Sequence, residues 1–176
     1  TTADIVLGQA NFNEAECNRA GAVSASSLCS PIGVSVDTAG NVYVADFLNN
    51  RVLQFDQPLS NDNIADRVLG QADFVSADAS GASASSLGSP VGVDVDALGN
   101  VFVSDFFNSR VLQYDTPMRS DAVADRVFGQ PDFTTVGCNQ SGVNGNSLCF
   151  PYGMDSDADG NLYQTDINNS RLLAYH

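Results

Sequence analysis

A carboxylate, an amide and a guanidinium recur at one fixed spacing, written D-x-x-N-x-R, in three places along the chain. Such groups can transfer protons, bind anions or form ion pairs. A catalytic group is normally needed once, whereas a structural ion pair is needed in every copy of a repeated unit. We therefore expect each Arg to donate to its Asp and to nearby loop carbonyl groups. The motif residues are Asp46, Asn49, Arg51, Asp105, Asn108, Arg110, Asp166, Asn169 and Arg171.

The acidic segment around Asp157 resembles the opening of a calcium-binding EF-hand loop, with Asp155 and Asp159 beside it and Asp166 at the twelfth position. The corresponding residues of the other two copies favour a hairpin turn, and an EF-hand also needs flanking helices. We therefore interpret the segment as a hairpin. The alternative is that carboxylates of several copies gather around a shared axis and hold calcium. Its candidates are Asp94, Asp96, Asp155 and Asp157, with Asp37. No other cofactor is predicted.

The four cysteines occupy matching loops of the first and third copies and are missing together from the second, where Gly88 replaces the later one. Joint presence and joint absence are what a disulfide within each loop predicts. Zinc is disfavoured because there is no C-x-x-C spacing and the single His is His176. Persistent disulfides indicate an oxidising compartment, so we expect a secreted, periplasmic or cell-surface protein. The predicted pairs are Cys17 with Cys29 and Cys138 with Cys149.

The composition excludes several classes of function. The chain has 21 acidic and 7 basic residues and a formal net charge of -14, so a nucleic-acid partner is not expected. No apolar run approaches the length of a membrane span. The sequence has no G-x-S-x-G elbow and no Ser–His or Cys–His pair beyond His176. We therefore predict no catalytic residue and no enzyme activity.

The elements that position these residues form a repeat. Residues 30–55, 89–114 and 150–175 share one pattern, and a second block, beginning V-L-G-Q or V-F-G-Q, opens at Val6, Val68 and Val127. In the first copy, alternating apolar residues and a Gly-Asn turn predict strands over residues 31–37, 42–45, 51–55 and 67–70. A unit of four antiparallel strands that cannot bury its own faces is typical of a propeller blade. The predicted fold is all-β, with three blade equivalents.

The pattern P-x-G-V-x-V-D-x-x-G-N-V-Y-V-A-D-x-x-N-x-R-V resembles the NHL repeat, over nearly the whole chain. The resemblance implies a propeller that usually has six blades, so residues 1–176 form one domain that is half of such a ring. Its repeats cover approximately residues 1–56, 57–115 and 116–176. The resemblance implies little about activity, because the family includes sensors, scaffolds, RNA binders and a lyase. The lyase branch uses zinc held by several His, and this chain has one.

The phase of the repeats predicts self-association. The chain opens on a fourth-strand block, residues 5–9, and its third copy stops after a third strand. Three blades are too few to close on themselves, and unpaired strands are exposed edges. We expect two chains to exchange the first strand head to tail and form a six-bladed ring. The same exchange without closure gives a filament, and the alternative is that the sequence is an excerpt of a longer propeller.

A loop rim is the predicted place for recognition, because variable loops on a rigid scaffold usually carry it. The expected function is therefore a non-enzymatic extracellular binding or scaffold module that recognises protein or carbohydrate. The alternatives are a structural subunit of a ring or filament and, more distantly, a propeller enzyme. Packing of the rim aromatics between blades is the competing interpretation of those side chains. The candidate rim residues are Phe47, Leu48, Phe106, Phe107 and Ile167.

Overall fold

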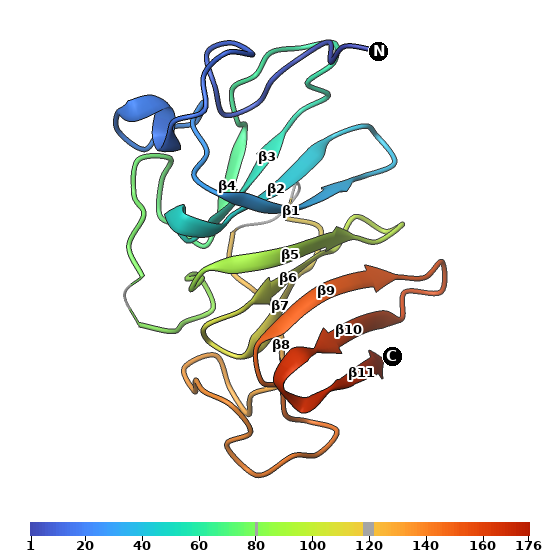
Figure 1. The fold of residues 1–176 in the computed structure, drawn as a ribbon. Helices are drawn as coiled ribbons and strands as arrows, with labels where there is room; N and C mark the ends of the chain where they lie inside the picture. Colours follow the sequence, from blue (N-terminus) through green and yellow to red (C-terminus); the bar gives the residue numbers. More distant parts are fainter. Residues whose placement is uncertain (80, 118–121) are drawn as a thin grey trace.

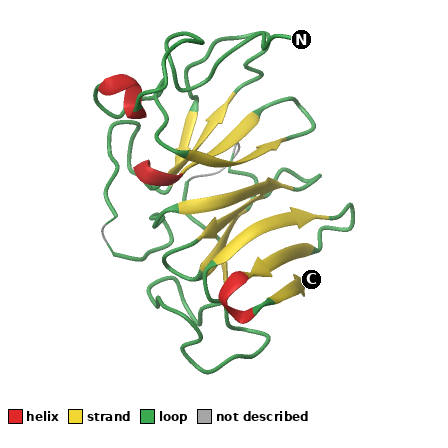
Figure 2. Cartoon of the chain, viewed as in Figure 1, coloured by secondary structure: helices red, strands yellow, loops and turns green. Residues whose placement is uncertain are grey.

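The computed structural model describes residues 1–79, 81–117 and 122–176, and it is built from three antiparallel sheets stacked face to face (Figure 1). We call the sheets blades 1, 2 and 3. Figure 2 shows that the strands make up the stack and that helical turns are confined to the connecting loops. The described residues contain no helix long and apolar enough to cross a membrane. The predicted all-β propeller architecture is confirmed.

Blade 1 is a four-stranded meander, in which each strand pairs with the next along the chain. Alternating Val and Ile residues form the inner strand. The turn into the next strand uses Gly40 (φ 89°) and a hydrogen bond from the Asn41 backbone N–H to the Asp37 carboxylate. The meander therefore follows from local turn chemistry. Its strands are β1 (Pro31–Val36), β2 (Val42–Asp46), β3 (Arg51–Phe55) and β4 (Arg67–Leu69).

Blades 2 and 3 repeat this plan. Within the described residues blade 2 has four strands and blade 3 has three. In blade 1, for which the sequence predicted strand bounds, the observed bounds agree to within one residue. The strands of blades 2 and 3 are β5 (Pro90–Val95), β6 (Val101–Asp105), β7 (Arg110–Tyr114), β8 (Arg126–Phe128), β9 (Pro151–Ser156), β10 (Leu162–Asp166) and β11 (Arg171–Tyr175).

Each blade has a front face and a back face, and the back of one blade packs on the front of the next. At the first junction Tyr43, Ala45 and Val52 on the back of blade 1 share a buried cluster with Val93 and Leu112 on the front of blade 2. The second junction is formed in the same way, by Phe102, Val111, Leu148 and Leu162. The core is therefore a row of junctions rather than one centre.

A glycine in each inner strand lets neighbouring blades approach closely. A Cβ atom on Gly33 would lie 2.6 Å from the carbonyl oxygen of Val91, and one on Gly92 would lie 2.5 Å from that of Tyr152. On Gly153 the nearest atom would be Thr165 Oγ1 at 3.6 Å. Gly33 and Gly92 use this clearance to contact the next blade, and the same clearance at Gly153 of blade 3 is open.

The two ends of the stack expose faces that are buried at the internal junctions. Val34 on the front of blade 1 is 65% exposed, whereas its counterpart Val93 is 5% exposed. On the back of blade 3, Tyr163 and Leu172 are exposed, although the matching residues of blade 1 are fully buried. Both end faces carry the pattern of a blade junction.

Residues 5–9 form no strand within the single chain, and their pairing with a second chain stays a prediction. The segment lies against blade 1, where Leu7 packs on the cluster that contains Leu28 and Phe55, but it forms no strand. A strand needs a neighbouring strand for its hydrogen bonds, and none of the described residues pairs with this segment. Side-chain pattern alone therefore could not decide its state.

Candidate functional site

The three D-x-x-N-x-R motifs form ion pairs at the ends of the blades. In blade 1, Arg51 Nε lies 2.8 Å from Asp46 Oδ2, and neither side chain is exposed. The guanidinium also donates to the carbonyl oxygens of Phe74 (2.6 Å), Ser24 (2.9 Å) and Ser27 (2.8 Å). Arg51 therefore ties the strand end to loops on both sides.

The carboxylate of this pair is equally well satisfied. Asp46 Oδ1 accepts the backbone N–H of Cys29 at 2.7 Å, and Oδ2 accepts the Asn49 side-chain amide at 2.8 Å in addition to Arg51. A buried ion pair is tolerated when its remaining hydrogen-bonding atoms have partners. The Asp46 oxygens thus accept hydrogen bonds from three groups of the same chain, and we call this arrangement a clamp.

The other two motifs repeat the clamp with graded burial. Arg110 Nε is 2.6 Å from Asp105 Oδ2 with both side chains buried, and burial raises the pKa of Asp105 against the opposing effect of Arg110. Arg171 Nε is 2.8 Å from Asp166 Oδ2, and the Arg171 side chain is 22% exposed. The structure thus brings all nine predicted motif residues into three local clusters.

Both predicted disulfides are present, Cys17–Cys29 and Cys138–Cys149, and the described residues contain no free cysteine. In the middle copy Gly88 takes the place of the second cysteine, and a Cβ atom there would lie 2.9 Å from Asn108 Nδ2. The middle loop is therefore packed directly against its motif, without a covalent link.

Two asparagines that the sequence analysis missed connect the disulfide loops to the clamps. Asn18 and Asn49 exchange two side-chain hydrogen bonds of 3.0 and 2.8 Å. Asn139 and Asn169 do the same at 2.9 Å in both directions. The available signal was that each follows the first cysteine of its loop, and the middle copy lacks this Cys-Asn pair. Each disulfide loop is thus held on its blade by amides as well.

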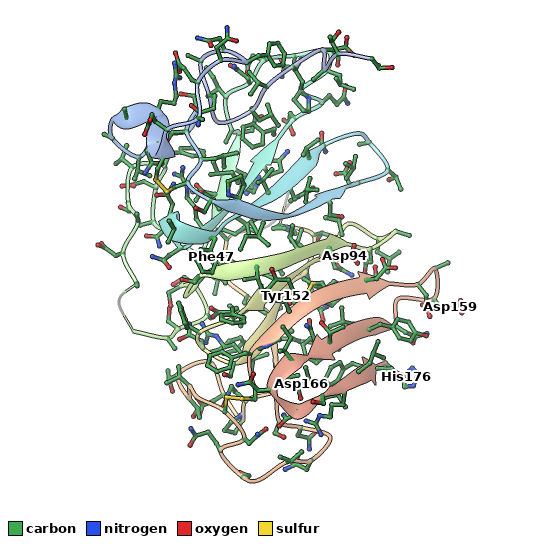
Figure 3. All side chains as sticks on the ribbon, viewed as in Figure 1. Phe47, Asp94, Tyr152, Asp159, Asp166 and His176 are labelled. Atoms are coloured by element: carbon green, nitrogen blue, oxygen red, sulfur yellow. A yellow bond between two sulfur atoms is a disulfide. The ribbon has the colours of Figure 1, made fainter. Side chains whose placement is uncertain are left out.

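The calcium arrangement is not formed among the described residues. Asp96 accepts the backbone N–H groups of Leu98 and Asn100 and the Asn100 side-chain amide, and Asp157 is used by its own turn in the same way. Asp94 contacts Ser35. The described part of the chain holds no group of three or more metal-ligating side chains, so Asp94, Asp96, Asp155 and Asp157 do not gather within one chain. Figure 3 places Asp159 at the tip of a turn.

An aromatic cluster joins the three blades at one end of the strands, and Figure 3 labels two of its members, Phe47 and Tyr152. Phe106 lies at its centre, with ring centroids 4.8 Å from Phe150, 5.4 Å from Phe107 and 6.2 Å from Tyr152. Phe47 of blade 1 reaches Phe107 at 6.4 Å. We call Phe47, Phe106, Phe107, Phe150 and Tyr152 the aromatic rim.

Part of this rim is open to solvent. Phe107 is 59% exposed, and Leu48 and Ile167 are exposed as well, whereas Phe47 and Phe106 are half-buried. The candidate rim residues therefore divide into exposed tips and aromatics that pack between blades. Phe150 and Tyr152 were missed because other copies have Ser or aliphatic residues there.

The strand meanders and their stacking define a β-propeller protein. The family model described as "NHL repeat" matches residues 28–55, so the chain contains an NHL repeat. A comparison with curated proteins gives no match.

Solved structures agree in fold. A nidogen/laminin complex is 22% identical, with a TM-score of 0.52 over 83% of this chain and 44% of that chain. A protein of unknown function from Bacteroides caccae is 13% identical, with a TM-score of 0.51 over 78% and 39%. Virginiamycin B lyase from Staphylococcus aureus is 12% identical, with a TM-score of 0.47 over 83% and 41%. This chain spans less than half of each, and at these identities the likeness concerns the fold alone.

Proposed function

We propose that this chain is a non-enzymatic binding or scaffold module of an extracellular or other oxidising setting, which completes its propeller by packing head to tail on a second copy. The observation that carries the proposal is the exposure of two junction faces at the ends of the stack. Val34 and Leu172 are 65% and 59% exposed, while their counterparts at the internal junctions are buried.

The two end faces are complementary by construction. Every internal junction packs the back of one blade on the front of the next, so the back of blade 3 matches the front of blade 1 in a second copy. Gly153 supplies the backbone clearance, and the exposed Ile32 of the second copy is the counterpart of Val91 and Tyr152. Two chains then give about six blades, which lies within the range of closed propellers.

The ionisable groups support a binding role rather than catalysis. The Asp–Arg pairs of the three motifs are engaged with each other, and Asp96 and Asp157 are engaged with their turns. Two exposed candidate rim residues, Leu48 and Phe107, remain available as a surface for a ligand. Apolar tips on rigid turns are suited to a protein or carbohydrate surface. The two disulfides favour an oxidising compartment.

Light scattering of the purified chain tests the assembly. We expect a monodisperse particle of twice 18.5 kDa. Because each copy has a formal charge of -14, added salt should tighten the association. A monomer at all concentrations would refute the assembly, and filaments in electron micrographs would favour the alternative of a structural subunit.

Binding arrays of extracellular proteins and glycans test the rim. We expect a ligand that the native chain binds and the Phe107→Ser variant does not. Leu59→Ser is the matched control, because Leu59 is also strongly exposed but lies outside the rim. Equal loss with both variants, or binding to no member of the arrays, would contradict a recognition role for the rim.

A further inference from the structure

We infer that Asn168, in the turn between β10 and β11, is an acceptor for an N-linked glycan. The acceptor motif N-x-S, or sequon, occurs twice in the sequence, as Asn139-Gln140-Ser141 and as Asn168-Asn169-Ser170. The structure distinguishes the two sequons, because the side chains of their first asparagines have different contacts. An acceptor role rests on the extracellular setting of the proposed function, since the sugar is added to chains that are exported.

The modification joins the side-chain amide of Asn168 to a sugar. Its Nδ2 atom forms a bond with the anomeric carbon of a lipid-diphosphate-linked oligosaccharide, on a membrane-bound oligosaccharyltransferase. The bond from that carbon to the diphosphate oxygen breaks, the lipid diphosphate leaves with the electron pair, and one Nδ2 proton passes to a base. Nothing is oxidised or reduced. Because the product carries a bulky chain on Nδ2, the folded protein must leave that atom free.

The side chain of Asn168 meets this requirement. It is exposed, and its amide makes no hydrogen bond with any of the described residues. The Ser170 hydroxyl is also exposed and has no hydrogen-bond partner in the described part of the chain. The backbone is nevertheless held, since the Asn168 N–H donates to the Cys149 carbonyl oxygen at 3.2 Å. The first sequon residue and the serine that follows therefore lie on a fixed turn with both side chains in solvent.

The fold itself does not require an asparagine at this tip. Asn168 lies in the short helical turn Ile167–Asn169, between β10 and β11 (Figure 2). The first copy forms the same turn, Phe47–Asn49, with Leu48 at the tip, and the middle copy has Phe107 there. Turn formation therefore does not explain why this one tip is polar.

The exposure of the tip does not depend on the uncovered face of blade 3. Leu48 is 54% exposed although blade 1 packs on blade 2, and Phe107 is 59% exposed although blade 2 packs on blade 3. A further blade beside blade 3 would leave Asn168 in solvent in the same way. A glycan at this tip is thus compatible with a closed ring and with the three blades alone.

The other sequon is occupied by contacts within the fold. Asn139 is half-buried, its Nδ2 donates to Asn169 Oδ1 at 2.9 Å, and its Oδ1 accepts from Asn169 Nδ2 at 2.9 Å. A sugar on this Nδ2 would take the place of a hydrogen on the donor atom and force the two amides apart. Asn18 makes the same pair of bonds with Asn49 and lies in no sequon, so pairing alone accounts for Asn139.

A glycan at Asn168 would change one of three equivalent loop tips. It would place a bulky, solvated chain next to the exposed Ile167 on blade 3. The corresponding tips of blades 1 and 2, Leu48 and Phe107, lie in no sequon and would stay apolar.

Secretion of the full chain from cultured human cells tests the site. The chain is expressed behind a cleavable secretory leader and purified from the medium and from the cell lysate, because the sugar is added before export. We expect one glycan, seen as a single loss of mass on treatment with peptide N-glycosidase. That enzyme converts the glycosylated Asn to Asp, so peptide mass spectrometry in heavy-oxygen water should assign the glycan to Asn168.

Two loss variants and one control define the acceptor. Asn168→Leu and Ser170→Asn each install the residue of the first copy, so we expect the native fold and complete loss of the glycan. Ser141→Ala is the matched control, because it removes the other sequon without altering the Asn139–Asn169 pair. We expect it to keep the glycan and the native glycan mass. A glycan that persists in either loss variant would place the acceptor elsewhere.

A gain variant tests whether the tip position itself is open. Phe107→Asn creates the sequence N-N-S in the middle copy, so we expect a second glycan. Leu48→Asn gives N-N-N, which is no sequon, and should add none. The absence of a second glycan on the Phe107 variant would contradict the accessibility of the tips.

The outcomes separate the acceptor role from the proposed function. A chain without a glycan, or with its glycan at Asn139, overturns the role of Asn168, and glycans at both asparagines overturn the distinction between the sequons. If such a chain still has both disulfides by thiol titration, the oxidising setting stands. Free thiols in the secreted chain would instead contradict the oxidising setting itself.

Discussion

Blades 2 and 3 follow the same sequence pattern but differ in how well they are buried. Val111 is fully buried and its counterpart Leu172 is 59% exposed, and Arg110 is fully buried while Arg171 is 22% exposed. Blade 2 has a blade on each face, and blade 3 has one. The burial of a residue in this fold therefore depends on the neighbouring blade as much as on the residue itself.

The disulfides lie in the two blades that have an exposed face and not in the blade that is covered on both faces. Blades 1 and 3, which have an uncovered face, carry the disulfide loops, and the middle blade has none. A disulfide stabilises a loop by restricting the unfolded chain, without needing a covering surface. Packing and cross-linking are therefore two means of holding the same loop, used in different blades.

Removal of the buried arginine gives the largest expected effect. Arg110→Ala should lower the free energy of unfolding by about 3–5 kcal/mol, because Asp105 then stays buried without its partner. Arg171→Ala should cost less, about 1–3 kcal/mol, since solvent reaches its side chain. Urea denaturation of dilute protein measures both. Equal losses of unfolding free energy in the two variants would contradict the difference in burial between blades 2 and 3.

The disulfides come next in size. Replacing Cys138 and Cys149 together by Ala should cost about 3 kcal/mol, because their loop of 11 residues regains its freedom in the unfolded state. The pair Cys17 and Cys29, separated by 12 residues, should cost about the same. Unfolding with and without reductant measures the effect. An unchanged denaturation midpoint would show that packing alone holds these loops.

The exposed end face gives a smaller and more selective effect. Val93→Ala should cost about 2 kcal/mol, because this side chain is buried at a junction. Val34→Ala should change the stability of the monomer by no more than about 0.5 kcal/mol. Thermal unfolding at two protein concentrations separates the cases. If Val34→Ala lowers the stability only at high protein concentration, the front face of blade 1 is covered by another chain under those conditions.

A turn shared by the copies gives the smallest effect. The Thr134 hydroxyl and the Thr134 and Thr135 N–H groups donate to Asp132 and lower its pKa to about 2. The ionised Asp132 carboxylate therefore stabilises the folded chain fully above its ordinary pKa of about 3.8, and this stabilisation is lost as the pH falls toward 2. Asp132→Asn should keep the turn, as Asn11 does in the first copy, and remove this pH dependence. Carboxyl NMR titration checks the value, and a pKa near 3.8 would contradict it.

Strand positions were predictable because local chemistry determines them. The β-branched run after Asn41 gave a strand over residues 42–45, and β2 extends it by one residue to Asp46. The disulfides followed from comparing copies. Residues 5–9 form no strand in the single chain, because a strand needs a pairing partner that their own side chains do not specify.

The candidate site was predictable where the copies repeat one another. The Asp–Arg pairing was predicted because the same motif recurs in all three copies. The Asn18–Asn49 contact joins residues 31 positions apart in sequence, and Phe150 and Tyr152 depart from the repeat rather than follow it. Of the candidate axial carboxylates, Asp96 and Asp157 accept hydrogen bonds from the amides of their own turns.

The clearance at Gly33 and Gly92 makes the blades modular. Since each junction uses one backbone approach, a further blade of the same pattern fits beside any other without a new kind of interface. The number of blades in such a stack can therefore change in whole steps, whereas the spacing between neighbouring blades is fixed by the glycine.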